Sequence, residues 1–105
     1  MDKQEAVDIM VRHLLTQGCR SGTDDRCMLR GPNGTKCAVG CLIPDDKYSE
    51  SMDDTDLSDI VENVLGLPWG FVEHFVYIHD TKDVEDWRKE LLGLCEELGV
   101  VFNEP

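Results

Sequence analysis

The chain of 105 residues has few basic residues and no long apolar run. Its 10 Lys and Arg stand against 22 Asp and Glu, so the formal net charge at pH 7 is -12. Such an excess of acid argues against a protein that grips nucleic-acid phosphates or an anionic membrane surface. No apolar stretch approaches the roughly 18 residues that a membrane span needs, and the N-terminus lacks the hydrophobic region of a signal peptide. We therefore expect no nucleic-acid partner, no membrane partner and a cytoplasmic location.

Internal repeats, low-complexity stretches and linkers are also absent, which excludes repeat and multi-domain architectures. No phosphate-binding glycine loop is present. An EF-hand calcium loop starting at Asp54 fails because Asp59 and Leu65 stand where glycine and glutamate are required. The hydrophobic fraction of 41% and the charged fraction of 30% are ordinary for a folded protein. The sequence therefore predicts one domain over residues 1–105.

The acidity is confined to the second part of the chain. Residues 1–41 hold five acids and six bases, a charge of +1, whereas residues 42–105 hold seventeen acids and four bases, a charge of -13. The densest stretch has eight acids between Asp45 and Glu62, with Lys47 as its only base. Part of this charge favours the positive end of a helix dipole. The excess beyond that suggests a basic partner or high solubility.

Apolar residues recur at helical spacing in four stretches. These lie between Asp2 and Gly18, over 57–65, over roughly 69–79, and between Asp83 and Gly99. The second stretch matches the i, i+3, i+4, i+7, i+8 pattern without a miss at Leu57, Ile60, Val61, Val64 and Leu65. The third directs toward the interior Phe71, Val72, Phe75, Val76 and His79. Asp2 and Asp83 are expected to cap their helices, and residues 100–102 are expected to dock as a short strand or plug.

A β-hairpin is predicted between the first two helices. Residues 27–30 and 35–39 flank a Gly-Pro-Asn-Gly turn at 31–34, whose proline presets φ and whose last two residues tolerate a positive φ. Two strands alone are marginal in water, so the hairpin is expected to lie on helices. Residues 38–43 could equally form a short buried helix, and their small side chains permit close backbone approach. The expected fold class is α+β: a mostly helical small domain of about four helices with one β-hairpin.

Five cysteines give an odd count, and without a secretory segment reduced thiols are expected. Four of them, Cys19, Cys27, Cys37 and Cys41, match the ligand number of a zinc site but lack Cys-x2-Cys spacing. Buried thiols are the favoured interpretation, because cysteine is among the residue types most often buried. No metal site and no cofactor is therefore predicted, with a zinc-stabilised module as the alternative.

The residue types of a cysteine hydrolase are also present. Cys37 or Cys41 would supply the thiolate, His79 the base and Asp80 the orienting acid. Neighbouring side chains on a helix diverge by about 100°, so Asp80 is expected to point away from His79. His79 is then read as filling the end of its helix, and the other two histidines, His13 and His74, as surface residues. A non-enzymatic role is favoured, and catalysis stays open.

The stretch from Cys27 to Tyr48 carries the most specific motif. It contains Cys-Met-Leu-Arg-Gly followed by Lys-Cys-Ala-Val-Gly-Cys-Leu-Ile-Pro-Asp-Asp-Lys-Tyr, and an Ile-His-Asp and a Trp follow later. This pattern resembles a family of small proteins of tailed bacteriophages and prophages with a Cys-Ala-Val-Gly-x-Leu-Ile-Pro-Asp signature. Met28 replaces the family's usual aromatic residue, and Cys41 stands where alanine is usual. The resemblance implies a viral protein in the cytoplasm of a bacterial host, and it implies no activity.

Two functions are consistent with these features. The first is a bacteriophage accessory protein, of a host-takeover or anti-defence type, that binds a bacterial protein such as a nucleic-acid-binding or defence protein through an acidic, nucleic-acid-mimicking surface. Its expected contact residues are Asp45, Asp46, Glu50, Asp53, Asp54 and Asp56. The second is a small-molecule or nucleotide binder, or a small Cys/His enzyme, with a pocket between the hairpin and the helices. Its expected lining residues are Arg30, Cys37, Tyr48, His79 and Trp87.

Overall fold

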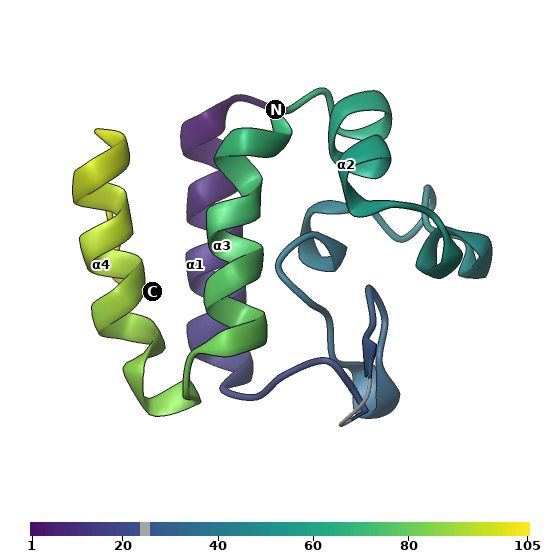
Figure 1. Cartoon of the computed structure of the whole chain (residues 1–105), viewed down its shortest axis with the longest axis horizontal. Helices are drawn as coiled ribbons and strands as arrows, with labels where there is room; N and C mark the ends of the chain where they lie inside the picture. The colour runs from purple at the N-terminus through teal and green to yellow at the C-terminus, as the bar shows by residue number, and fades with distance from the viewer. Residues whose placement is uncertain (24–25) are drawn as a thin grey trace.

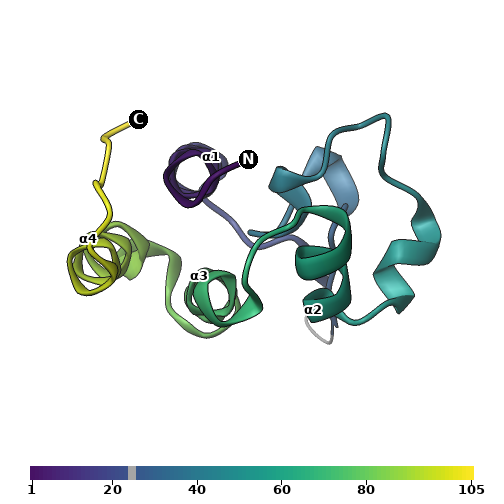
Figure 2. The same cartoon turned by 90° about the horizontal axis from the view of Figure 1, so that it is seen from above.

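The computed structural model describes residues 1–23 and 26–105, and the side chains of all residues outside 22–27. Within this part, three long helices lie side by side: α1 (Lys3–Gln17), α3 (Trp69–Thr81) and α4 (Trp87–Leu98). Figure 1 shows α1 and α3 running in the same direction and α4 running back beside them. Residues 19–66, here called the lobe, connect α1 to α3 through short turns and one short helix, and Figure 2 shows the lobe on the side away from α4.

Helix α1 confirms the first predicted helix. The carboxylate of Asp2 accepts a hydrogen bond from the backbone N–H of Glu5 at 2.8 Å, which satisfies one of the free donors at the helix start. Gly18 ends the helix with φ of 65°, a left-handed conformation that glycine adopts without steric cost. The predicted apolar stripe is fully buried: Val7, Met10, Val11 and Leu14.

Helices α3 and α4 also follow their predicted patterns. All five side chains that α3 was expected to direct inward are buried. A 3-10 turn, η5 (Val84–Asp86), leads into α4, and Gly99 ends α4 with φ of 71°. The predicted side-chain cap at Asp83 is wrong: the backbone carbonyl of Asp83 accepts from the N–H of Asp86 at 2.9 Å, and its carboxylate makes no capping bond.

The second predicted helix exists, but its turns widen. Helix α2 (Leu57–Asp59) continues as a π-helical segment, η4 (Ile60–Val64), in which the N–H of Leu65 donates to the carbonyl of Ile60 at 3.1 Å. A bond spanning five residues rotates later side chains away from the 3.6-residue pattern. Ile60 and Val61 are therefore buried as predicted, whereas Val64 is 39% exposed.

The predicted β-hairpin is wrong, and the fold is all-helical rather than α+β. A single bridge between Arg30 and Lys36 is the only pairing of residues 27–30 with 35–39. In the described part of the chain, the other strand-like contact is a two-residue ladder between β1 (Gly22–Thr23) and β2 (Arg26–Cys27).

Consecutive burial explains why no second strand forms after the turn. Residues 37–40 and 42–43 are all buried, whereas a strand lying on helices would bury alternate side chains. The backbone closes locally instead, as the N–H of Cys41 donates to the carbonyl of Cys37 at 3.0 Å and leads into a 3-10 turn, η2 (Gly40–Leu42). This turn is nearer to the alternative expectation of a short buried helix.

Two local expectations in this region are confirmed. Asn33 and Gly34 adopt φ of 60° and 74° within a 3-10 turn, η1 (Pro32–Gly34). Gly40 lies so close to the backbone that a Cβ placed there would be 2.0 Å from the carbonyl oxygen of Leu29. Only glycine fits at that contact, which holds η2 against the segment before the turn.

One hydrophobic core joins the helices and the lobe. Its largest fully buried side chains are Trp87, Phe75, Met10, Leu14, Ile60 and Leu91. The segment after α4 is extended but forms no strand. The backbone of Val101 donates to the Gln4 side chain and accepts from it, both at 2.9 Å, which ties this segment to α1.

Candidate functional site

Asp53, one of the six expected contact acids, is part of the fold. Its Oδ1 accepts from the backbone N–H of Leu29 at 2.8 Å, and its Oδ2 accepts from the hydroxyl of Tyr48 at 2.6 Å. The hydrogen bond to Asp53, aided by burial, raises the pKa of Tyr48 to about 12. Asp53 lies in the 3-10 turn η3 (Glu50–Asp54), so these bonds hold that turn against two other segments of the lobe.

Asp45 contacts two basic side chains from the first half of the chain, Arg30 and Lys36. Its Oδ1 accepts from Arg30 Nη1 at 2.6 Å and lies 3.7 Å from Lys36 Nζ. The hydrogen bond from Arg30, together with the charge of Lys36, lowers the pKa of Asp45. Arg30 also donates to the carbonyl of Ile43 at 2.8 Å and stacks 4.6 Å from the centre of the Tyr48 ring. This arginine therefore joins its own segment of the lobe to residues 43, 45 and 48.

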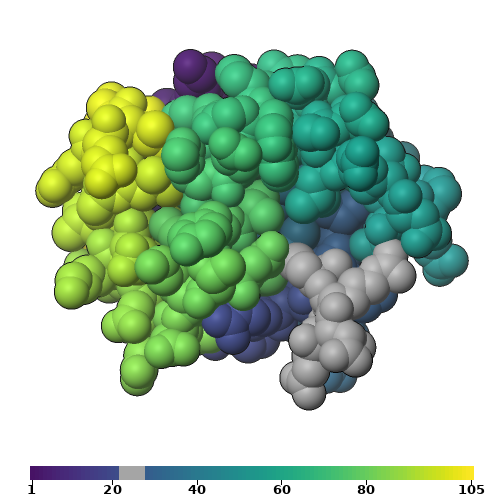
Figure 3. All heavy atoms as spheres, in the orientation of Figure 1, coloured from purple at the N-terminus to yellow at the C-terminus, as the bar shows by residue number. Residues whose placement is uncertain are grey.

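The other four expected contact acids are exposed, and Asp59 joins them. Together they form the acidic face, defined here as Asp46, Glu50, Asp54, Asp56 and Asp59. Among the described residues, no hydrogen-bond or ion-pair partner approaches the carboxylates of Asp46, Glu50, Asp56 and Asp59. Figure 3 shows the teal surface of this region at the end of the molecule opposite α4. The longest extent of the molecule is 34 Å.

The five residues of the expected pocket separate into two pairs and Cys37 on its own. Arg30 and Tyr48 contact each other in the lobe, as described above. His79 and Trp87 pack against each other with ring centroids 5.5 Å apart, and they are 1% and 0% exposed. Cys37 is buried and its sulfur accepts from the backbone N–H of Gly40 at 3.3 Å. None of these five side chains lines any of four hollows on the described surface, and the burial of His79 and Trp87 separates them from the half-buried pair in the lobe.

The expectation that Asp80 points away from His79 is wrong. His79 Nδ1 lies 2.7 Å from Asp80 Oδ1 on the last turn of α3, so the two side chains meet although they are neighbours in sequence. The backbone N–H of Ser21 donates to His79 Nε2 at 3.2 Å, so Nδ1 carries the proton and donates to Asp80. With both nitrogens engaged, the ring ties residue 21 to α3 and offers no free base.

Of the cysteines whose side chains are described, Cys37 and Cys95 are buried, Cys41 is half-buried and Cys19 is exposed, so the prediction of buried thiols is wrong for Cys19. Cys41 donates to the carbonyl of Ala38 at 3.1 Å, and burial raises the pKa of its thiol, which therefore stays protonated. Among described side chains, one group of three or more possible metal ligands has all its ligand atoms within 4.8 Å of one another. It consists of the exposed acids Asp83, Glu85 and Asp86. The side chain of Cys27, a residue of the zinc hypothesis, lies outside the described residues.

A hollow on α1 was not predicted from the sequence. It has a volume of about 360 Å³, and we call it the α1 hollow. It is lined by Asp8, Ile9, Arg12, His13, Thr16, Lys36 and Cys41. His13 is half-buried there rather than on the open surface, with Nε2 donating to the carbonyl of Lys36 at 2.9 Å. The signal was present, since residues 9, 12, 13 and 16 repeat the i, i+3, i+4, i+7 spacing on a second face of α1.

Comparisons with protein-family models, with curated proteins and with solved structures give no match for this chain. In the described residues, no helix combines the length and the apolar character that crossing a membrane requires.

Proposed function

We propose that this protein is a bacteriophage accessory factor that binds a basic bacterial protein, such as a nucleic-acid-binding or defence protein, through its acidic face. It works in the cytoplasm of the host. The signature between Cys27 and Tyr48 supports the viral origin. The observation that carries the binding role is the set of exposed carboxylates of Asp46, Glu50, Asp56 and Asp59, which have no partner among the described residues, whereas the fold uses Asp45 and Asp53.

The local charge supports a basic partner. Between residue 42 and residue 81 the sequence has Lys47 as its only Lys or Arg, so no cation of this stretch other than Lys47 neutralises the face. Carboxylates on a surface of one sign steer a basic protein toward it and offer the charge that the partner's nucleic-acid site accepts. Such an encounter weakens as salt screens the charges.

Salt-dependent capture from a bacterial lysate tests this role. The wild-type protein is immobilised and compared with Asp46→Lys/Glu50→Lys, and bound proteins are identified at 50 and 500 mM NaCl. We expect the wild type to retain basic proteins at low salt and release them at high salt. Duplex DNA added at low salt should displace the same proteins, since both compete for one basic site.

The matched control is Glu96→Lys/Glu97→Lys, which makes the same change in net charge on exposed residues of α4. This variant should retain the partners that Asp46→Lys/Glu50→Lys loses. Equal loss in both variants would show a nonspecific effect of net charge. Retention by the acidic-face variant, or failure of DNA to compete, would contradict the proposed function.

A further inference from the structure

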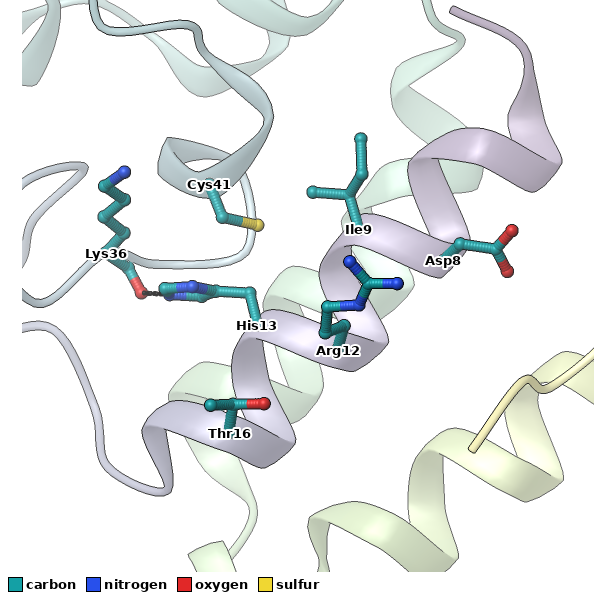
Figure 4. A pocket seen from close by; sticks show the side chains of 7 residues that line it. All are labelled: Asp8, Ile9, Arg12, His13, Thr16, Lys36 and Cys41. Carbon is teal, nitrogen blue, oxygen red and sulfur yellow. Dashed lines mark hydrogen bonds between the residues drawn. The ribbon is translucent and has the colours of Figure 1, made fainter. Parts of the chain in front are cut away.

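The α1 hollow is lined by two basic residues in an acidic molecule. Arg12, Lys36 and Asp8 line its wall in a chain of net charge -12, and the Lys36 ammonium lies 3.7 Å from the carboxylate of Asp45. The Asp8 carboxylate accepts from Gln4 and from Asn103, each at 2.9 Å. In Figure 4 it points away from the middle of the hollow. With Asp8 turned aside and Lys36 beside Asp45, Arg12 is the charged group of this wall that can meet an anion.

Arg12 has unused hydrogen-bonding capacity. Its side chain is exposed and makes no hydrogen bond or ion pair with any residue that the structure describes. A guanidinium presents five N–H donors in a planar fork that matches the two oxygens of a carboxylate or phosphate. In a protein with 22 acids, an exposed arginine that lies beside a hollow and pairs with none of the acids that the structure describes can take an anion from outside.

The floor of the hollow adds no charge of its own. Cys41 lies there, and burial raises the pKa of its thiol, which therefore stays protonated.

The remaining walls suit a compact apolar group. Ile9 is 38% exposed on α1, and the ring of His13 lies between it and Lys36 in Figure 4. The bond from His13 to the Lys36 carbonyl fixes the ring before any ligand arrives, which lowers the entropy lost on binding. A volume of about 360 Å³ lies within the range of small-molecule sites, about 300 to 1,000 Å³.

We infer that the α1 hollow binds a small organic anion, with a carboxylate or phosphate group on Arg12 and a compact apolar body between Ile9 and the His13 ring. This site lies on α1 and uses none of the residues of the acidic face. The inference therefore stands or falls separately from the proposed function.

Titration by two-dimensional NMR tests it, with phenyl phosphate, benzoate, inorganic phosphate and benzyl alcohol as probes. We expect phenyl phosphate or benzoate to shift the resonances of Ile9 and His13, with a dissociation constant in the millimolar range that is usual for so small a ligand. Whichever of the two binds more tightly identifies the preferred head group. Inorganic phosphate and the neutral alcohol should each bind at least fivefold more weakly.

Two variants of equal charge locate the anion. Arg12→Gln should weaken binding of both aromatic anions at least fivefold, and it should leave the fold intact because Arg12 has no partner among the residues that the structure describes. Arg88→Gln removes a guanidinium that pairs with Glu104 beside α4, and it should leave the affinity within twofold. Equal effects of the two variants, no shifts at 20 mM of either anion, or equal binding of benzyl alcohol would each overturn the inference. The comparison of probes needs no variant.

Discussion

Tyr48 joins segments of the lobe that share no regular structure. Its hydroxyl donates to Asp53, which also accepts from the backbone N–H of Leu29. The guanidinium of Arg30 stacks on the Tyr48 ring. Replacing Tyr48 with phenylalanine leaves the ring in place and removes one hydrogen bond to a carboxylate. A bond to a charged acceptor contributes about 1.5–3 kcal/mol, so we expect Tyr48→Phe to lower the free energy of unfolding by about that amount, measured by urea denaturation at pH 7.

The same bond makes stability depend on alkaline pH. The pKa of Tyr48 is about 12 in the folded protein and about 10 for an unfolded tyrosine. Between these values the folded state keeps a proton that the unfolded state loses, so the contribution is complete below about pH 10 and falls as the pH rises toward 12. The stability difference between wild type and Tyr48→Phe should therefore shrink over this interval. In Tyr77→Phe, where Tyr48 is the only tyrosine, ultraviolet titration near pH 10 would contradict this account.

A close contact with the backbone of Leu29 requires glycine at residue 40, whereas no contact requires glycine at residue 93. A methyl group at residue 40 would meet the Leu29 carbonyl at 2.0 Å, and the backbone there has to move to admit it. We expect Gly40→Ala to destabilise the protein by about 3 kcal/mol or more, in the range of severe steric substitutions. Gly93 lies on the exposed face of α4 with open space around it, so Gly93→Ala should stabilise the protein by about 0.5–1 kcal/mol. Thermal unfolding of both variants checks the contrast, and equal effects would refute it.

At the scale of elements, residues 19–21 are fastened to the end of α3. Arg20 donates to the carbonyl of His79 at 2.9 Å and to the carbonyl of Lys82, while Ser21 donates to the His79 ring. A cation at the last carbonyls of a helix also complements the helix dipole. This contact fixes where the lobe begins relative to the three long helices.

Removing that cation should loosen the end of α3. We expect Arg20→Met to lower the free energy of unfolding by about 1–2 kcal/mol and to speed hydrogen exchange of the Lys82 amide, which donates to Ile78 at 3.1 Å. Arg12→Met makes the same change at an exposed arginine that has no partner in the described part of the chain, and it should stay within about 0.5 kcal/mol of the wild type. Exchange at Lys82 that is unchanged in Arg20→Met would argue against the fastening.

The elements that were predicted correctly are those whose information is local. α1, α3 and α4 each have a 3.6-residue apolar stripe, α1 and α4 end at a glycine, and α3 begins directly after Pro68, so these signals act within or beside one element. The stretch 37–43 was misjudged because a run of buried apolar residues suits a strand and a tight turn equally well. Only the contact of Gly40 with Leu29 decides between them. The π-helical segment after α2 was not predicted, because the i, i+3, i+4, i+7, i+8 pattern assumes regular turns of 3.6 residues.

The sites depended on contacts between elements. The sequence indicated a concentration of acids, but it did not distinguish Asp53, which the fold uses, from Asp46, which it leaves exposed. That difference depends on the positions of Tyr48 and Leu29, and so could not be read from spacing alone. The α1 hollow, in contrast, had a signal in the spacing, because residues 9, 12, 13 and 16 form a second stripe on α1. Ile9 is the one apolar residue of that stripe, so the stripe resembled an ordinary exposed helix face.

At the scale of the whole molecule, the charge of -12 opposes compactness. At 10 mM salt the Debye length of about 30 Å is comparable to the 34 Å extent of the molecule, so its carboxylates repel one another throughout. At 0.5 M the repulsion acts only between near neighbours. We expect the unfolding midpoint to rise with NaCl over this range by about 4–8 °C, the shift that about 1 kcal/mol gives in a domain of this size.

The acidic face should account for part of that rise. Asp46→Asn/Glu50→Gln removes two carboxylates that have no partner in the described fold, so this variant should unfold at a higher temperature than the wild type at 10 mM NaCl and respond less to added salt. Glu96→Gln/Glu97→Gln provides the matched control on α4. If the acidic-face variant is more stable yet no longer captures the basic partner, these carboxylates are retained for binding at the expense of stability. An identical salt response in wild type and variant would instead mean that the acidic face is too well solvated for its charges to repel.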